Sequence, residues 1–127
     1  MSRGASGSKP VVLIVEDEPL IRWSAELALA EAGFSFLSAA NAEEAIGWLE
    51  RRDDIVIVFS DVAMPGERDG VVLAAMVRAS RPHIGIVLTS GHFEKLPADI
   101  GPPARFLPKP YSDSELISAI AEVRETG

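Results

Sequence analysis

The fold is decided by a run of apolar residues, IVIVF, at positions 55–59. The run has no polar alternation and is rich in β-branched side chains, which is typical of a strand buried on both faces of a parallel sheet. Two similar runs stand at residues 11–15 (VVLIV) and 84–88 (IGIVL). Residues 34–37 (FSFL) alternate in part and predict a strand nearer the sheet edge, and residues 104–107 (ARFL) predict a short final strand.

Helical segments separate these strands. Residues 19–32 place apolar side chains at helical spacing and stop at Gly33, a residue that favours the left-handed conformation after a helix. Three further helices have start signals of the capping type: Asn41 with Glu44, Asp69 before Gly70, and Ser112 with Glu115. Residues 92–99 predict only a short, weak helix, because a proline interrupts them. Five strands alternating with five helices predict an α/β fold, a three-layer sandwich around a five-stranded parallel sheet.

Length, charge and composition narrow the class of protein. The chain has 127 residues, which suits one domain, and we expect residues 1–9 to form a flexible tail before a domain at 10–127. It has no cysteine, which excludes disulfides, zinc–thiolate sites and thiol catalysis. Its net charge of −7 disfavours direct nucleic-acid binding. No apolar run has the length that a membrane span needs, so we expect a soluble, cytoplasmic protein without a membrane partner.

Polar side chains follow several of the predicted strands at the point where each strand ends. Glu16 and Asp17 follow the first strand, Asp61 the third, Thr89 the fourth and Lys109 the fifth. Ligands of open parallel sheets bind outside the carboxyl ends of the strands. We therefore expect these side chains to form one constellation at one edge of the sheet.

This set of side chains indicates a metal-assisted phosphoryl site. Crowded carboxylates repel one another unless a cation lies among them. With oxygen ligands alone, Mg²⁺ is the expected ion, and Mn²⁺ is an alternative. A carboxylate beside a divalent cation, a lysine and a hydroxyl is well placed to accept a phosphoryl group.

Four motifs carry a resemblance to a known family. They are VVLIVEDEP at residues 11–19, FSDVAMPG at 59–66, VLTSGH at 87–92 and FLPKPY at 106–111. In this order they resemble the response-regulator receiver domains of two-component signalling, from residue 11 to about residue 123. The resemblance implies a flavodoxin-like topology with strand order 2-1-3-4-5. It also implies a histidine kinase or histidine phosphotransfer protein as the phosphoryl donor, with a downstream protein partner that the sequence does not identify.

By position, the resemblance implies a role for each residue of the site. Asp61 is the expected phosphoacceptor. Asp17 is the expected direct metal ligand, Glu16 is expected to act through water, and the backbone carbonyl of Ala63 is a further ligand. The remaining implied roles are phosphoryl binding by Thr89 and Lys109, a rotamer switch at Phe106, and a cis peptide bond between Lys109 and Pro110. This chain departs from the commoner pattern by having Glu16 in the acidic pair and phenylalanine instead of tyrosine at the switch position.

The first helix presents a second apolar stripe, formed by Leu20, Trp23, Leu27 and Ala30. One interpretation is a docking surface for the helices of a kinase or phosphotransfer protein. The other is internal packing against the last helix. The sequence alone leaves both open.

The resemblance implies a switching phosphoacceptor that is not an enzyme, apart from catalysing at most its own phosphorylation and dephosphorylation. Three other functions are alternatives to this one. An aspartate-nucleophile phosphatase of the haloacid-dehalogenase type needs an acid two residues after the nucleophile, where this chain has Ala63. A flavin or nucleotide module needs a phosphate-binding loop after the first strand, where this chain has the acidic EDEP. A non-switching receiver-like scaffold for protein binding is disfavoured by the complete set of site residues. Whether the chain stands alone or is part of a longer protein is open.

Overall fold

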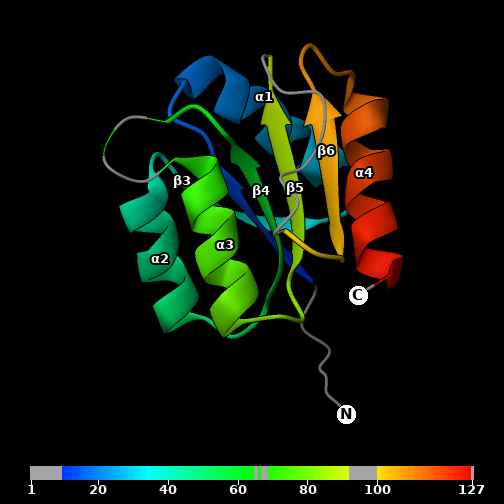
Figure 1. Cartoon of the computed structure of the whole chain (residues 1–127). Helices are drawn as coiled ribbons and strands as arrows, with labels where there is room; N and C mark the ends of the chain where they lie inside the picture. The colour runs from blue at the N-terminus through cyan, green and yellow to red at the C-terminus, as the bar shows by residue number, and fades with distance from the viewer. Residues whose placement is uncertain (1–9, 65, 67–68, 92–99, 127) are drawn as a thin grey trace.

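The computed structural model describes residues 10–64, 66, 69–91 and 100–126 (Figure 1). A parallel sheet of five strands forms its centre, in the order β3-β2-β4-β5-β6. The strands are β2 (Val11–Val15), β3 (Ser35–Ala39), β4 (Ile55–Asp61), β5 (Gly85–Ser90) and β6 (Ala104–Pro108). The described helices are α1 (Pro19–Glu31), α2 (Ala42–Arg51), α3 (Gly70–Ser80) and α4 (Asp113–Thr126).

The expected α/β sandwich and its strand order 2-1-3-4-5 are confirmed, because the first strand in the sequence, β2, lies between the second and the third. The partly alternating segment forms β3, which is an edge strand as predicted. The structure describes four helices where the sequence predicts five, since the weak helix expected at residues 92–99 lies outside the described residues. The expected tail at residues 1–9 also lies outside them.

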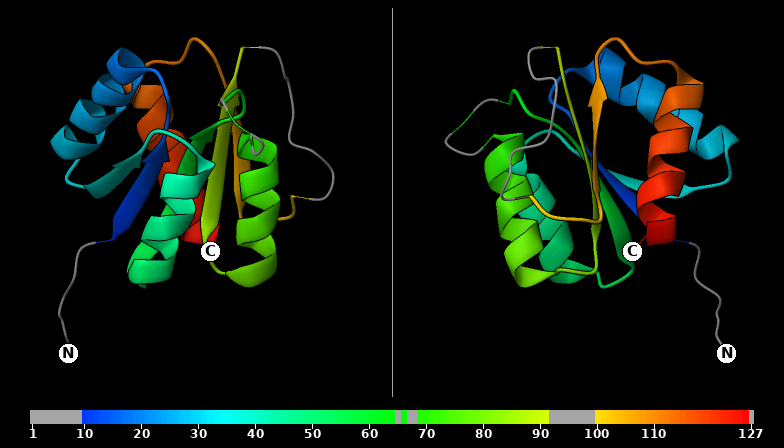
Figure 2. Two further views of the ribbon diagram at one scale, coloured as in Figure 1. Left: turned by 90° about the vertical axis from the view of Figure 1, so that its left-hand side faces the viewer. Right: turned by 45° about the vertical axis from the view of Figure 1, so that its right-hand side comes forward.

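The helices form two layers, with α1 and α4 on one face of the sheet and α2 and α3 on the other (Figure 2). Alternate residues of β2 serve the two layers. Leu13 packs in the cluster with α2 and α3, whereas Ile14 packs in the cluster with α1 and α4. Because successive side chains of a strand point to opposite faces, a strand covered on both faces must be apolar throughout. This explains the unbroken apolar runs in the sequence.

Three of the described helices, α2, α3 and α4, begin at the predicted caps. The side chains of Asn41 and Asp69 accept hydrogen bonds from the backbone N–H groups of Glu44 (2.9 Å) and Val72 (3.0 Å). At α4, the backbone N–H of Ser112 donates to Glu115 and that of Glu115 donates to Ser112, a complete capping box. Gly33 follows α1 with φ of 88°, the left-handed conformation expected there. Within the described part of the chain, no helix has the length and apolarity to cross a membrane.

The start of α3 presses against the end of β4, where Asp61 lies. The backbone N–H of Gly70 donates to the carbonyl of Val62 at 2.9 Å. A Cβ atom added at Gly70 would lie 2.2 Å from the carbonyl oxygen of Asp61. Only glycine therefore allows this close approach between α3 and the strand that carries Asp61.

We expect Gly70→Ala to lower the free energy of unfolding by about 1–3 kcal/mol, because α3 or the end of β4 must move. Urea titration followed by circular dichroism measures this change. Gly47→Ala is the matched control, since Gly47 lies inside α2 and its added Cβ would meet only the Arg51 side chain, at 3.9 Å. It should raise stability by about 0.5–1 kcal/mol. Equal stability of the Gly70 variant and the wild type would contradict the close packing.

Candidate functional site

Three carboxylates meet at the carboxyl edge of the sheet. Glu16 and Asp17 follow β2 directly, and Asp61 is the last residue of the neighbouring strand β4. One oxygen from each of the three lies within 4.8 Å of the other two. Glu16 and Asp61 are only 4% and 6% exposed, while Asp17 is exposed. The structure thus brings together the acids that the sequence predicts to meet.

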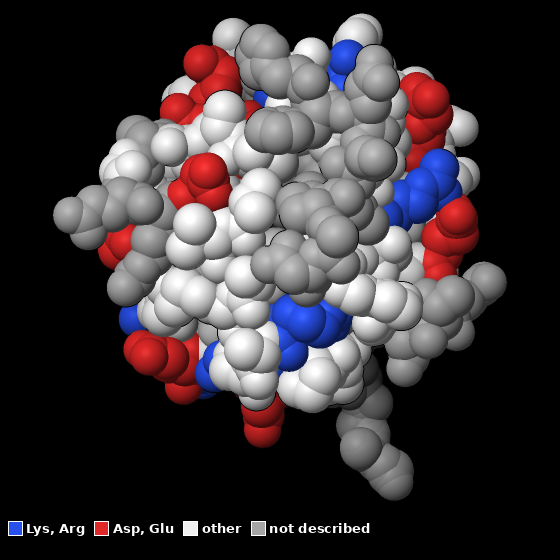
Figure 3. Space-filling model, in the orientation of Figure 1, with Lys and Arg blue, Asp and Glu red and all other residues white. Residues whose placement is uncertain are grey.

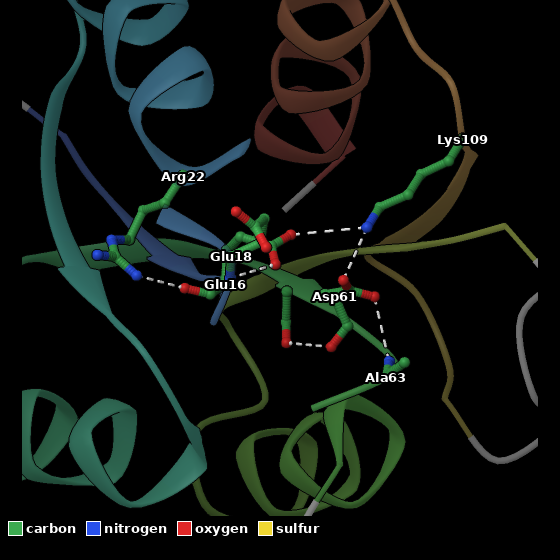
Figure 4. Close-up of polar contacts among 7 residues, drawn as sticks. Glu16, Glu18, Arg22, Asp61, Ala63 and Lys109 are labelled. Carbon is green, nitrogen blue, oxygen red and sulfur yellow. Dashed lines mark hydrogen bonds and ion pairs between the residues drawn. The ribbon is translucent and has the colours of Figure 1, made fainter. Parts of the chain in front are cut away.

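Lys109 supplies the positive charge of the site (Figure 4). Its Nζ lies 2.7 Å from Oδ2 of Asp61 and 3.6 Å from Oε1 of Glu16. Burial by itself lowers the pKa of Lys109, but the hydrogen bond to Asp61 and the charges of both acids outweigh it, so the pKa is raised. The backbone N–H of Lys109 donates to the carbonyl of Ser90 at 3.1 Å, and the Lys109–Pro110 peptide bond is cis, as expected.

Glu16 is held through both its side chain and its backbone carbonyl. Burial raises its pKa to about 7, against the opposing effect of a hydrogen bond of 3.0 Å from the backbone N–H of Glu18; the nearby charge of Asp61 raises it further. Nη1 of Arg22 donates to the backbone carbonyl of Glu16 at 2.8 Å (Figure 4). The sequence does not predict this role of Arg22, because a side-chain contact to the backbone of the preceding loop leaves no residue-type signal.

Thr89 lies beside Asp61 in the sheet, since the two residues are paired in the register of β4 and β5. The Thr89 side chain is 1% exposed, and its Oγ1 is buried without a hydrogen-bond partner in the described part of the chain. An unsatisfied buried hydroxyl costs about 1–3 kcal/mol. A ligand with hydrogen-bond acceptors at the site would supply the missing partner.

The donor set suits a hard divalent cation. Carboxylate oxygens are the ligands that Mg²⁺ prefers, and Glu16, Asp17 and Asp61 offer three of them. Oδ1 of Asp61 accepts a hydrogen bond of 3.1 Å from the backbone N–H of Ala63, which keeps Ala63 beside the acids. Its expected role as a carbonyl ligand stays a prediction.

Two aromatic residues, Phe106 and Tyr111, lie on either side of Lys109 in the sequence. Phe106 lies in β6 opposite Leu88 and packs, half-buried, against the core cluster shared with α2 and α3. Its role as a switch stays a prediction. Tyr111, for which the sequence predicts no role, packs edge-on against Phe59 at 5.8 Å between ring centres. Burial, followed by the charges of the neighbouring acids, raises the pKa of Tyr111 to about 12.

The apolar stripe of α1 lies on the surface. Leu20, Trp23 and Leu27 are 72%, 58% and 45% exposed, so internal packing of these three against α4 is wrong. The contact between α1 and α4 is made by other residues of α1, including Ala28 and Leu29. A groove of about 540 Å³ leads from this surface to the charged site, lined by Leu20, Ile21, Ser24, Lys109, Pro110 and Tyr111.

Comparisons with known proteins agree on one family. A sequence model of the response regulator receiver domain matches residues 12–121. The chain is 38% identical to the sensor kinase CckA of Brucella abortus, covering 94% of this chain and 13% of that protein. It is 32% identical to the transcriptional regulatory protein AruR of Pseudomonas aeruginosa, covering 86% of this chain and 47% of that protein. The chain therefore spans less than half the length of either relative.

A solved structure shows the same relationship in three dimensions. The receiver domain of the hybrid histidine kinase CckA superposes with a TM-score of 0.76 and 31% sequence identity. The match covers 90% of this chain and 98% of that domain.

The raised pKa of Glu16 makes stability depend on pH. A carboxyl group whose pKa is higher in the folded state binds its proton more tightly when the chain is folded. The free energy of unfolding therefore falls as the pH rises from the pKa of the unfolded state to that of the folded state. For Glu16 this window runs from 4.5 to about 7. We expect Glu16→Gln to be more stable than the metal-free wild type at about pH 8 and close to it at about pH 4.5.

Urea titrations at both pH values, in the presence of a chelator, test this expectation. Glu50→Gln, which removes a carboxylate from an exposed position of α2, is the matched control. A stability difference between Glu16→Gln and the wild type that is the same at both pH values would contradict it.

Proposed function

The chain belongs to the response regulator receiver domain family of two-component systems, and from this premise we propose that it accepts a phosphoryl group on Asp61. The observation that carries the proposal is the setting of Asp61, which ends a central strand between the Lys109 ammonium and the acids that follow β2. The Lys109 ammonium offsets the negative charge of this carboxylate, and the carboxylate forms a cluster with Glu16 and Asp17 that could hold a cation. We propose a phosphoacceptor signalling role in the cytoplasm, with no activity beyond catalysing its own phosphorylation and dephosphorylation.

The proposed reaction is a transfer from a phosphohistidine of the partner. An oxygen of the Asp61 carboxylate forms a bond to phosphorus, the phosphorus–nitrogen bond breaks, and its electron pair stays with the leaving imidazole. Lys109 hydrogen-bonds an oxygen of the transferring group and offsets its negative charge. The hydroxyl of Thr89 donates to another of these oxygens and thereby gains the partner that it lacks in the described structure.

Mg²⁺, or Mn²⁺ in its place, is the proposed cofactor. Asp17, Asp61 and the carbonyl of Ala63 would hold it directly, and Glu16 would act through water. When bound, the ion neutralises charge on the phosphoryl oxygens as the group moves. Residues of the chain position the Asp61 carboxylate for the transfer: its oxygens accept hydrogen bonds from the backbone N–H of Ala63 and from Nζ of Lys109.

The proposed donor is a histidine kinase or a histidine phosphotransfer protein, which docks on α1. Leu20, Trp23 and Leu27 form an exposed apolar surface, and the adjoining groove reaches Lys109. A helix lying on this surface would bring its histidine to the open side of the charged site. The hot-spot residue of such a contact is expected to be Trp23, since large aromatic side chains dominate interface energies.

The proposed output is a shift in conformation that begins at Thr89. A phosphoryl group on Asp61 draws the Thr89 hydroxyl and the Lys109 ammonium towards it. Phe106, three residues before Lys109 in the same chain segment, changes its packing in response. The surface near β5 and β6 then binds its downstream partner with a different affinity.

We expect the intact protein to gain one phosphoryl group on incubation with Mg²⁺ and acetyl phosphate, and Asp61→Ala to gain none. Intact-protein mass spectrometry makes the measurement, and a sample with excess chelator should also stay unmodified. Beryllofluoride binding, followed by fluorine NMR, distinguishes rapid hydrolysis of the adduct from a site that does not react. A folded wild type that neither gains the group nor binds beryllofluoride would leave the non-switching scaffold as the better description.

We expect Trp23→Ala to slow phosphotransfer from a phosphorylated histidine protein by about tenfold or more, because the interface loses its largest apolar side chain. Phosphorylation by acetyl phosphate should stay within about twofold of the wild type, since Trp23 is not part of the charged site. Radiolabel transfer in a rapid-quench experiment measures both rates. Met76→Ala, which removes an exposed apolar side chain from α3 on the other face, is the matched control. Equal slowing of both reactions would refute docking through Trp23.

A further inference from the structure

A single arginine ties several chain segments together at the end of the sheet remote from the acids. Arg78 lies in the last turn of α3 and is half-buried. Its guanidinium donates to four backbone carbonyls: Nε to Gly101 (3.1 Å), Nη1 to Pro82 (2.9 Å) and Ile84 (2.8 Å), and Nη2 to Pro103 (2.7 Å). Among the described residues it forms an ion pair with no carboxylate. Its charge is therefore satisfied by the backbone.

The four carbonyls belong to two separate segments. Pro82 and Ile84 lie between α3 and β5, whereas Gly101 and Pro103 lead into β6. Figure 3 shows positively charged side chains in the lower part of the face turned to the viewer. Figure 1, in the same orientation, places the end of α3 and the start of β5 in this region. Arginine can bridge the two segments because its donors form a rigid, planar fork.

The contact to Pro103 lies at the entry to β6. The carbonyl of Pro103 also accepts a hydrogen bond of 3.0 Å from the backbone N–H of Ile86, the residue of β5 that pairs with Ala104. Two donors, one from β5 and one from α3, thus hold the same oxygen. This matters for β6 because it is an edge strand, with β5 as its one neighbour in the sheet.

The position of this entry determines where Lys109 leaves the sheet. The β5–β6 pairing runs without a shift from Ile86 opposite Ala104 to Ser90 opposite Pro108. Lys109 comes next, and its backbone N–H donates to the carbonyl of Ser90. Pro103 and Lys109 are about 20 Å apart along an extended strand. A change in strand register would move Lys109 away from Asp61.

We propose that Arg78 is a positioning residue for Lys109: by holding the entry of β6 against β5 and α3, it keeps the Lys109 ammonium beside Asp61. The inference rests on the proposed phosphoacceptor function and adds to it a residue at the opposite end of the sheet. Arg78 itself touches none of the reacting groups.

Arg78→Lys tests the proposal, because lysine keeps the charge but its single ammonium cannot reach all four carbonyls. Arg81→Lys is the matched control. Arg81 also lies just after α3, but its Nη2 donates to the carbonyl of Leu49 at the end of α2, away from β6. Lys109→Met is the reference, since it removes the ammonium that Arg78 is proposed to place.

Two readouts distinguish a displaced Lys109 from general damage. The rate of phosphorylation by acetyl phosphate at saturating Mg²⁺ should fall about tenfold or more in Arg78→Lys. The affinity for Mg²⁺ alone, measured by calorimetry, should rise in both Arg78→Lys and Lys109→Met, because the Lys109 charge opposes a second cation at the same acids. Arg81→Lys should change both by less than about twofold.

Each other result overturns the assignment. A folded Arg78→Lys that is phosphorylated at the wild-type rate shows that Lys109 keeps its place without the fork. Loss of Mg²⁺ affinity together with the rate shows damage to the whole site. A variant that stays unfolded even with a stabilising osmolyte shows that Arg78 serves folding as a whole. A wild type that is not phosphorylated would instead refute the proposed function, and the Mg²⁺ comparison of Arg78→Lys with Lys109→Met would still test Arg78.

Discussion

The ion pair between Lys109 and Asp61 is the interaction on which the site depends. Buried carboxylates so close together destabilise one another, and the ammonium at 2.7 Å from Asp61 and 3.6 Å from Glu16 offsets that repulsion. β4, which ends in Asp61, and β6, which Lys109 follows, are not neighbours, because β5 lies between them. The side chain of Lys109 therefore reaches across the end of β5, and it does so only if β4, β5 and β6 keep their register.

The rest of the fold supplies the stability that this site does not. The apolar strands fill two clusters of apolar side chains, one on each face of the sheet, and the buried polar or charged residues that the structure describes all lie at or just after the carboxyl ends of strands. At this carboxyl edge, Glu16 is buried with a raised pKa, and the Thr89 hydroxyl lacks a partner in the described structure. Such local costs are tolerated where they prepare a site for a ligand.

The two ends of the sheet carry different kinds of interaction. At the carboxyl end, the acids and Lys109 lie together, and Thr89 is paired with Asp61 in the register of β4 and β5. At the other end, the Arg78 guanidinium donates hydrogen bonds to backbone carbonyls of the segments before β5 and β6 and so connects these segments. Because an extended strand has a fixed rise per residue, holding one end of it in place also determines the position of the other end. The edge strand β6 needs that constraint most, because a central strand is held from two sides.

Much of this protein could be predicted from its sequence alone. The apolar runs, the caps at Asn41 and Asp69 and the stop at Gly33 are local signals, because each depends on neighbouring residues and the periods of helix and strand. The meeting of Glu16, Asp17 and Asp61 also followed, since parallel strands bring their carboxyl ends to one edge. The order of the strands was expected from a resemblance to receiver domains, and the pairing bears it out.

The features that depend on distances between segments remote in the sequence became known only from the three-dimensional structure. It placed Trp23 on the surface when packing against α4 was equally open, because exposure depends on the neighbours that a helix face meets. It gave Arg78 four carbonyl partners and left the Thr89 hydroxyl without one in the described residues. Residue types and spacing reveal which groups can form hydrogen bonds, but the partner of each group is determined only when the chain has folded around it.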